Sequence, residues 1–506
     1  MKGCSNFKSF KDPVHGYVDV CGELVPLVDS PVFQRLRGIR QTGFAYYVYH
    51  GMEHSRFNHS LGVAHLAREV IPFIAANTRL YYGSVGGHAL AEALESTSLV
   101  FQAAALIHDI GHLPFSHASE AGISDGQLVF GAKSLESLPP RHEAYTLCLA
   151  SHVAGLVEKV EPVLTTSLEG DLKLILGGEA GEATLEYIAS CAASILNQLL
   201  AGGIDIDRMD YLHRDSLYAG VSYGLFDVDR LIRLLVASPI LQKGSSRLEV
   251  DPLSCRVLVL DKGLSIVESF LLARFYMFSE VYLHRVVETY NSLYARLLAL
   301  LGAEGVVGDL DYGVVLPIPR PEKIREGDEE ALKAWIALDG NQVIGLIRSV
   351  AWGSIELRDY RGEARRLAEM ILGRRHPKLL HAVDDRRLWA SYKVFLETGG
   401  SPLPSRITSI LRELVELQRE DPLLIVRPLR VDLEAIKNIS IYDRGIQGIR
   451  EIRLEGKEEN PLEERIRKLA EIGVYRVIAI APKGHEKQLA RARELLEEAR
   501  KAARAL

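Results

Sequence analysis

Apolar residues recur at helical spacing from about residue 30 to residue 300. Residues 55–82, SRFNHSLGVAHLAREVIPFIAANTRLYY, form one long pattern of this kind, with Ser55 or Asn58 as the expected N-cap. Residues 98–111, SLVFQAAALIHDIG, are apolar on nearly every face, which is typical of a central helix in an all-α core. Similar patterns over residues 183–203 and 265–302 predict further long helices.

The pattern becomes less regular in two other stretches. Residues 119–141 lack a sustained period and predict a loop or an insertion. Residues 302–330 are rich in Gly, Pro and charge, which is typical of a connector. Helical spacing then returns as far as about residue 417.

The last part of the chain mixes strand and helix signals. β-Branched runs over residues 421–436 and 474–484 flank a helical pattern over 462–473, and a charged helix follows over 486–506. The sequence therefore predicts a mainly α fold in three parts: a helical core over 1–300, a connector and helical extension over 301–420, and a smaller α+β C-terminal lobe over 421–506.

Composition narrows the class of protein. The 506 residues include 66 acidic and 60 basic side chains, a formal net charge of −6. The chain therefore lacks the excess of positive charge that is typical of a nucleic-acid-binding protein, although the net charge does not exclude local basic patches. No uncharged apolar stretch is long enough to cross a bilayer, and the polar N-terminus is unlike a signal peptide. We therefore expect a cytoplasmic protein without a membrane partner.

The cysteines and the overall residue usage add two expectations. Five cysteines lie far apart without a C-x-x-C pair, so we expect reduced thiols at Cys4, Cys21, Cys148, Cys191 and Cys255. Asn and Gln are sparse whereas Arg, Glu and Leu are abundant, which weakly indicates a thermophilic source.

One apolar run contains an unusual group of ionisable side chains. Residues 104–117, AALIHDIGHLPFSH, hold three histidines and an aspartate, and burying such groups unpaired costs about 2–7 kcal/mol each or more. A helix through this run would place His108 and His112 on one face, with Asp109 one step around. Imidazole nitrogen and carboxylate oxygen together can bind a divalent metal. Alone this signal is weak, since short motifs also arise by chance.

Two distant segments strengthen the metal hypothesis. RFNHSLG places His59 near the start of a helix, with Arg56 one turn earlier. GIDIDRMDYLHRDSLYAG aligns Asp207, Tyr211 and Asp215 as a polar stripe where an amphipathic helix would be apolar. We interpret Asp205 and Asp210, off this stripe, as ordinary capping and surface residues. A shared cation explains these ionisable groups better than packing does.

These residues have a recognisable order. His59, His108-Asp109 and Asp207 resemble the H…HD…D signature of the HD-superfamily metal phosphohydrolases. The segments DPVHGYVDV, FQRLRGIRQTGFAYYVYHG, SRFNHSLGV, HDIGHLPFSH, RHEAY and GIDIDRMDYLHRD occur in the order of the HD-domain deoxynucleotide triphosphohydrolases. The strong resemblance covers residues 8–300 and implies an HD-domain helical core. No SAM domain is expected before it.

The resemblance implies a role for each matching residue. The metal ligands would be His59, His108, Asp109 and Asp207. The catalytic group would comprise His112, His117 and His142, with Glu143 beside it. Substrate would be bound by Gln41, Arg56, Arg208, Tyr211, Asp215, Tyr282 and His284, the two arginines holding phosphate and Gln41 and Asp215 the sugar. The match loosens at Glu280 and Glu288, which leaves the base preference open; both could simply face solvent.

A second site is implied near the N-terminus. Lys8, Asp29, Gln34 and Arg37 match positions that bind an activating guanine nucleotide at a subunit interface in the family. The same segment could instead be an ordinary amphipathic one whose exposed Arg and Gln bind nothing. The resemblance also implies a homo-oligomer, either a dimer or a tetramer.

Three functional hypotheses remain. The first is a metal-dependent dNTP triphosphohydrolase in which water attacks the α-phosphorus, with GTP or a dNTP as activator. The second is another HD phosphohydrolase, a nucleotidase or a phosphodiesterase. The third is a non-catalytic nucleotide-sensing scaffold. The cofactor would be one divalent ion, since N/O ligand sets accept Mn, Fe, Zn, Ni, Co or Mg, and Mg²⁺ could also accompany the phosphates.

Overall fold

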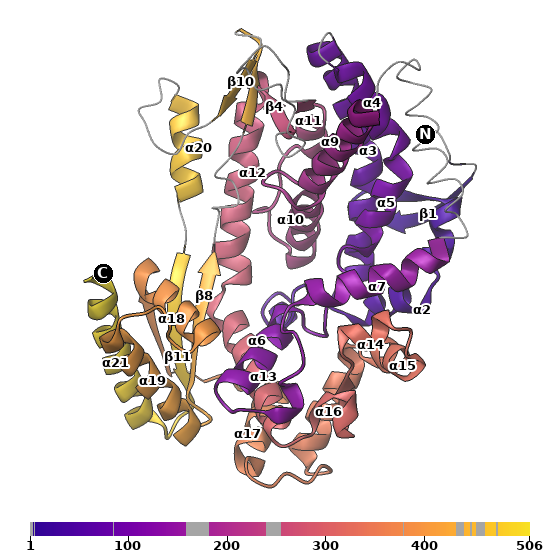
Figure 1. The fold of residues 1–506 in the computed structure, drawn as a ribbon. Coiled ribbons are helices and arrows are strands. Elements are labelled where there is room, and N and C mark those ends of the chain that lie inside the picture. The colour runs from indigo at the N-terminus through magenta and orange to yellow at the C-terminus, as the bar shows by residue number, and fades with distance from the viewer. Residues whose placement is uncertain are drawn as a thin grey trace.

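The computed structural model describes residues 4, 6–83, 86–157, 182–238, 255–377, 379–431, 440–445, 448–451, 461–471 and 474–505. Helices dominate the first three hundred residues (Figure 1), and the expected mainly α fold is confirmed. The long ones are α3 (Arg56–Tyr82), α4 (Gly87–Ser96), α5 (Ser98–Ile107), α6 (His117–Leu128), α7 (His142–Val157), α9 (Glu182–Ala201), α10 (Ile206–Ala219), α12 (Leu264–Tyr276) and α13 (Arg285–Ala303). Shorter ones are α1 (Val25–Val28), α2 (Pro31–Gln34) and α11 (Val228–Ile232).

Two small sheets border this core. Strands β1 (Phe7–Asp12) and β2 (Gly16–Cys21) form an antiparallel hairpin in which Asp12 pairs with Gly16. A four-stranded sheet has the order β10-β9-β4-β3 and combines β3 (Leu235–Ser238) and β4 (Arg256–Leu260) with the late strands β9 (Ser440–Asp443) and β10 (Gly448–Glu451). Helix α20 (Pro461–Glu471) packs against α12, so this late segment joins the core.

The region after residue 303 extends the helical part. The short parallel strands β5 (Val307–Asp309) and β6 (Leu316–Ile318) interrupt the expected connector. Four helices follow: α14 (Pro321–Arg325), α15 (Glu329–Ala337), α16 (Gly340–Trp352) and α17 (Arg361–Leu372). Helix α17 packs on α13 and α14 packs on α7, so the extension supports the core from one side (Figure 1).

A C-terminal lobe lies at the lower left of Figure 1. Its antiparallel sheet has the order β7-β11-β8, formed by β7 (Leu379–Asp384), β11 (Val474–Ala481) and β8 (Ile425–Val431), and it packs with α18 (Arg386–Thr398), α19 (Ser405–Glu420) and α21 (Glu486–Arg504). The lobe thus takes β7, α18 and α19 from the range expected to be helical extension. Buried Arg296 of α13 ties it to the core by donating to the carbonyls of Pro422 and Leu424.

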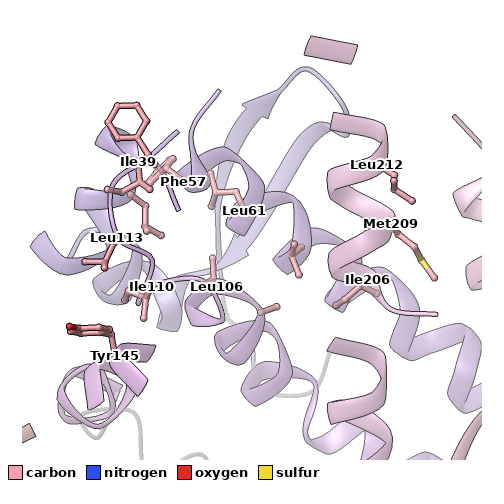
Figure 2. Close-up of a cluster of buried hydrophobic side chains, with 14 of the residues drawn as sticks. Ile39, Phe57, Leu61, Leu106, Ile110, Leu113, Tyr145, Ile206, Met209 and Leu212 are labelled. Carbon is pink, nitrogen blue, oxygen red and sulfur yellow. The ribbon is translucent and has the colours of Figure 1, made fainter. Parts of the chain in front are cut away.

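A buried apolar cluster holds together the segments that carry the expected metal ligands. Figure 2 shows Phe57 and Leu61 of α3, Leu106 of α5, Ile110 after α5 and Met209 of α10 in this cluster. These side chains alternate along the chain with His59, His108-Asp109 and Asp207. Apolar burial of about 1.5–3 kcal/mol per large side chain therefore fixes the backbone next to each ionisable group.

Three secondary-structure predictions are wrong in detail. The helix over 98–111 ends at Ile107, because Gly111 and Pro114 disfavour its continuation. The expected loop over 119–141 contains α6 and a short 3-10 helix, Lys133–Leu135. The helix over 265–302 is divided into α12, a π-helical segment, Met277–Tyr282, and α13, whose N-cap His284 accepts from the Val286 N–H at 3.3 Å.

The expectation that all five cysteines are reduced is also wrong. Disulfides join Cys4 to Cys21 and Cys191 to Cys255, with Cα–Cα distances of 5.7 and 5.5 Å. Spacing along the chain, 17 and 64 residues, concealed both pairs because the β1–β2 hairpin and the packing of α9 on β4 bring them together. Buried Cys148 is a free thiol.

The sequence predicts no membrane-spanning segment, but one helical stretch is long and apolar enough to be a candidate. Ile188–Ala219, which spans α9 and α10, reaches the length and the mean hydropathy, 1.2, of a candidate span. The bent pair α4–α5 passes together only as a broken span. Since the core helices of soluble proteins meet the same criteria, and α10 packs on α3 while α9 packs on α4, this is weak evidence. The absence of a membrane partner stays a prediction.

Candidate metal centre

Four side chains from three separate segments meet at one point. His59 lies in the first turn of α3, Asp207 in the first turn of α10, and His108 and Asp109 directly follow α5. His59 Nε2 is 2.9 Å from Asp207 Oδ1 and 3.6 Å from Asp109 Oδ2. His108 Nε2 is 3.5 Å from Asp109 Oδ2 and 3.6 Å from Asp207 Oδ1. Ligands about 2.1 Å from an ion lie roughly 3.0–3.4 Å apart, so one cation fits among them.

The chemistry of the cluster also suits a cation. The buried His108 Nε2 has no hydrogen-bond partner in the part of the chain that the structure describes. Burial lowers the pKa of His59, but the hydrogen bonds with Asp207 and Asp210 outweigh it and raise this pKa to about 10. The carboxylates therefore draw positive charge to this point, and a divalent ion ligated by nitrogen and oxygen would supply it.

A buried carboxylate orients the first ligand. Asp210 Oδ2 lies 2.8 Å from His59 Nδ1, which directs Nε2 of the same ring toward the other ligands. Arg214 donates to both oxygens of Asp210 at 2.8 and 2.9 Å, and His15 Nε2 lies 2.6 Å from Oδ1. A Cβ at Gly62 would collide with Asp210 and Arg214, so only glycine allows this approach of α10 to α3. Asp210 is fully buried, and its interpretation as a surface residue is wrong.

Arg56 joins the metal ligands to the cavity. Its guanidinium donates to Asp109 and, at 3.0 Å, to Ser116 Oγ. Burial raises the pKa of Asp109, but Arg56 and the nearby histidines hold it well below its usual value. The carboxylate is therefore ionised, and the cationic Arg56 side chain lies where the metal cluster borders the cavity.

Three histidines form a second group around one carboxylate. The rings of His112 and His142 stack with centroids 3.6 Å apart. Glu120 of α6 lies 2.7 Å from His142 Nδ1 and 2.9 Å from His117 Nδ1. The hydrogen bond with Glu120 raises the pKa of His117, whose side chain is exposed, whereas burial and Arg56 hold the pKa of buried His112 well below its usual value. One histidine is thus suited to donate a proton, and another stays neutral.

Two local backbone features create this arrangement. Phe115 and Ser116 have φ of 61° and 51°, a left-handed conformation that turns the chain sharply between His112 and α6. A Cβ at Gly111 would collide with the backbone of His142 and Thr146 at the start of α7. Glycine there allows α7 to bring His142 against His112.

A cavity of about 350 Å³ opens beside both groups. Ten of the residues predicted from the sequence line it: Gln41, Arg56, Asp109, His112, His117, His142, Asp207, Tyr211, Asp215 and Tyr282. Asp215 accepts from the Tyr282 hydroxyl at 2.5 Å and lies 2.6 Å from His54 Nε2. The polar stripe of α10 therefore faces the cavity, as the spacing of Asp207, Tyr211 and Asp215 predicts.

Three of the residues predicted to act in catalysis or substrate binding lie outside the cavity lining. Arg208 donates to the side chain of Asp205, three residues earlier in the chain, and to the carbonyl of Gly202. Glu143 is exposed, 3.6 Å from His142 Nδ1, and His284 caps α13. Their roles stay predictions.

The four residues of the predicted regulatory site lie close together in two pairs. Lys8 Nζ forms an ion pair with Asp29 at 2.9 Å. Arg37 Nε donates to Gln34 Oε1 at 2.7 Å, and its guanidinium lies 3.6 Å from the centre of the Phe57 ring. Exposed Lys8, Asp29 and Arg37 are accessible to a ligand in the single chain.

Sequence reasoning missed several residues of this site. Glu120, Asp210 and His54 contact predicted residues, and Asn291 lines the cavity together with Glu288, which the sequence already singled out with solvent exposure as the alternative. Helical spacing held a signal for one of them, because Glu120 lies three residues after His117. The others depend on contacts between distant segments, which no local pattern reveals.

Residues 56–215 match the HD domain family. All four residues of the candidate metal cluster fall within that range, so the resemblance to the HD-domain proteins is confirmed, and this part of the chain is an HD domain. The helical core expected from the resemblance is likewise confirmed.

Three relatives show how far the similarity reaches. The uncharacterized protein YwfO of Bacillus subtilis is 32% identical over 299 residues, which cover 58% of this chain and 56% of that protein. The deoxynucleoside triphosphate triphosphohydrolase SAMHD1 of Gallus gallus is 32% identical over 239 residues, 45% of this chain and 36% of that enzyme. The human protein of the same name is 30% identical over 246 residues, 45% of this chain and 35% of that protein. The chain thus matches about half of the length of YwfO and about a third of the length of the two SAMHD1 proteins.

A solved structure resembles the chain over nearly its whole length. The phosphohydrolase from Bacteroides thetaiotaomicron covers 94% of this chain with a TM-score of 0.59 at 22% identity. At this identity the comparison shows a shared fold.

Proposed function

We propose that the protein is a metal-dependent hydrolase that cleaves deoxynucleoside triphosphates into a deoxynucleoside and inorganic triphosphate. The observation that carries this proposal is one cavity beside the His59, His108, Asp109 and Asp207 cluster that also holds phosphate-binding, proton-donating and sugar-binding groups. The similarity to triphosphohydrolases named SAMHD1 supports the same substrate class.

The phosphates would lie between the metal cluster and the histidines. A divalent ion bound at the cluster would polarise a phosphate oxygen and a water molecule. Arg56, already paired with Asp109, would hold a phosphate oxygen and offset its charge. Water would attack the α-phosphorus, and the bond from phosphorus to the nucleoside 5′-oxygen would break.

Proton delivery falls to the second group of histidines. The 5′-oxygen leaves as a poor anion unless an acid protonates it, and a histidine titrates in the required range. Glu120 raises the pKa of His117, which favours the protonated form of that ring. The neutral ring of His112 stacks on His142 and faces the phosphates without adding a further proton donor.

The sugar would bind at the other polar group of the cavity. Asp215 accepts from Tyr282 and is held by His54, which leaves lone pairs on its oxygens for a sugar hydroxyl. Gln41 lines the same cavity, and its buried Oε1 has no partner in the described part of the chain. Both groups can therefore orient a deoxyribose.

Regulation and assembly form part of the same proposal. Lys8, Asp29, Gln34 and Arg37 would bind an activating GTP or dNTP, with the carboxylate of Asp29 accepting from the guanine N–H edge. Gln34 connects the two pairs, because its amide donates at 2.8 Å to the carbonyl of Val28, directly before Asp29, and this proximity supports a shared ligand. We propose a cytoplasmic homo-oligomer, since the family site lies between subunits.

The test is a complete dNTP panel with Mg²⁺ or Mn²⁺, with and without GTP. We expect inorganic triphosphate from at least one dNTP. Release of monophosphate or pyrophosphate instead would identify another phosphohydrolase of this superfamily. No triphosphate under any condition would reject the proposal, and an Asp207→Ala variant that loses metal yet keeps the biological activity would favour a nucleotide-sensing scaffold.

A further inference from the structure

An acidic side chain in the cavity has no role in the proposed chemistry. Glu288, in the first turn of α13, lines the cavity together with Val287 and Asn291. Its hydrogen-bond partner is Asn291, whose Nδ2 donates to Glu288 Oε1 at 3.0 Å. Among the described residues this hydrogen bond is to Asn291 and not to a residue of the metal cluster. Glu288 therefore contributes to the cavity a carboxylate that is not one of the predicted ligands.

Asn291 fixes the orientation of this carboxylate. The Asn291 Oδ1 accepts from the backbone N–H of Phe44 at 3.2 Å, so the amide Nδ2 is the end that faces Glu288. A Cβ at Gly43 would approach Asn291 Oδ1 to 3.0 Å, and Gly43 has a φ of +58°. With one oxygen engaged by this fixed amide, Oε2 of Glu288 is left for a ligand.

Apolar side chains line the same cavity. Phe115, Phe278 and Val287 are among them, and Phe115 stacks with centroids 4.3 Å apart on Phe44, whose backbone N–H donates to Asn291. Aromatic and aliphatic walls suit the flat face of a nucleobase, which stacks on such surfaces. A phosphate finds neither cation nor donor in these three side chains.

The charge of Glu288 decides what it can bind. Burial raises its pKa, and Arg427 and Asn291 compensate only in part. A carboxylate so placed repels phosphate oxygens and gains from N–H donors, because a buried acceptor without a partner is costly. The 3′-hydroxyl of the deoxyribose already has Asp215 and Gln41, so the nucleobase is the remaining source of donors in the nucleotide.

We propose that Glu288 is a specificity-determining residue that accepts hydrogen bonds from the N–H edge of the nucleobase and favours guanine. This inference rests on the proposed function, since it assumes a nucleotide in the cavity. Guanine presents adjacent donors at N1 and the 2-amino group, which match Oε2 and the lone pair of Oε1 that Asn291 does not use. Adenine, cytosine and thymine each present a single donor group on their pairing edge.

The test compares dGTP with dITP, whose base lacks only the 2-amino group. We expect wild-type protein to prefer dGTP by roughly tenfold or more in kcat/KM, because losing a partner leaves a buried acceptor unpaired. Glu288→Gln keeps the shape and removes the charge, and should bring the ratio close to one. Glu288→Asp retracts the carboxylate by one methylene and should give an intermediate ratio. Thermal unfolding of each variant checks folding.

Glu280→Gln is the matched control. Glu280 lies in the preceding π-helical segment, is exposed and is not part of the cavity lining, so the same change of charge should leave the ratio unaltered. An unchanged dGTP to dITP ratio in Glu288→Gln, or an equal shift in Glu280→Gln, would overturn the proposal. Both outcomes leave triphosphate release by the wild type intact.

A binding measurement separates this inference from the proposed function. If the wild type releases no triphosphate, the function fails, and calorimetry with dGTP and dITP still measures the affinity ratio in wild type and Glu288→Gln. A ratio that falls in the variant supports base selection by Glu288. A ratio that does not fall, or no binding of either nucleotide, rejects it.

Discussion

At the scale of single residues, Asp210 shows how the metal cluster is held. Its carboxylate contacts the side chains of His59, Arg214 and His15. The hydrogen bond with His59 Nδ1 sets the direction of Nε2, the predicted ligand atom of the same ring. Replacing such an outer partner commonly costs about 10–100-fold in metal affinity. The carboxylate therefore matters as much for orientation as for charge.

We expect Asp210→Asn to lower the affinity for Mn²⁺ by about 10–100-fold, because one neutral amide oxygen replaces the two charged oxygens that now hold His59, His15 and Arg214. Calorimetric titration of the metal-free protein measures this directly. Asp227→Asn is the control, since exposed Asp227 caps α11 far along the chain from any ligand and asparagine caps equally well. Equal Mn²⁺ affinity in wild type and Asp210→Asn would contradict the assigned role.

Glu120 controls protonation rather than metal binding. It raises the pKa of His117, and a general acid loses activity as pH rises through its pKa. In Glu120→Gln the pKa of His117 should fall, so the alkaline limb of the kcat/KM profile should move to lower pH, with a drop of roughly 10–100-fold at neutral pH.

The control for this profile is Glu136→Gln, which removes an exposed carboxylate directly after the 3-10 helix Lys133–Leu135. It should leave the alkaline limb in place. A limb that stays fixed in Glu120→Gln, or that moves to higher pH, would show that His117 is not the acid.

At the scale of elements, the sequence predicts regular helices and misses the irregular turns that form the site. The helix expected over 55–82 appears as α3, and that expected over 183–203 as α9, because apolar spacing alone determines each. The turn from His108 to Ser116 was missed. Its shape depends on left-handed Phe115 and Ser116 and on the approach of α7, neither of which leaves a periodic signal.

Residues of the site were predictable where they share one face of a helix. Asp207, Tyr211 and Asp215 form a polar stripe on one helix, so helical spacing reveals them. Asp210 lies on the same helix, but its partners come from α3 and from the β1–β2 turn, and burial there follows only from the three-dimensional contacts. A buried charge network of this kind resembles a solvated face when read from sequence.

Gly111 tests the packing of α7 against the turn. In Gly111→Ala the added methyl group would push the start of α7 away from His112, and we expect a loss of about 1–3 kcal/mol in unfolding free energy together with reduced activity. Gly345→Ala is the matched control, because its Cβ meets nothing within 4 Å on α16 and should stabilise the helix by about 0.5–1 kcal/mol. Denaturant unfolding compares the two; equal stability would contradict the packing argument.

At the scale of the whole molecule, the β1–β2 hairpin connects the predicted regulatory site to the metal cluster. One end of β1 carries Lys8, paired with Asp29, and the other carries Asp12, which accepts from Arg214 at 2.8 Å. His15 in the hairpin turn contacts Asp210. A ligand that shifts the hairpin would therefore change the surroundings of Asp210, which is a contiguous physical route for coupling.

This route predicts that GTP binding and catalysis are coupled. GTP should raise kcat/KM of the wild type by about 5–150-fold, the usual range for a coupling between two sites. Asp29→Asn removes the acceptor for the guanine N–H edge and the partner of Lys8, so it should abolish activation while keeping the rate measured without GTP. Glu53→Gln neutralises an exposed carboxylate that lies 4.0 Å from Arg40, and this variant should keep the activation. Rate assays with and without GTP, combined with light scattering to follow assembly, check both variants; activation that survives in Asp29→Asn would place the activator elsewhere.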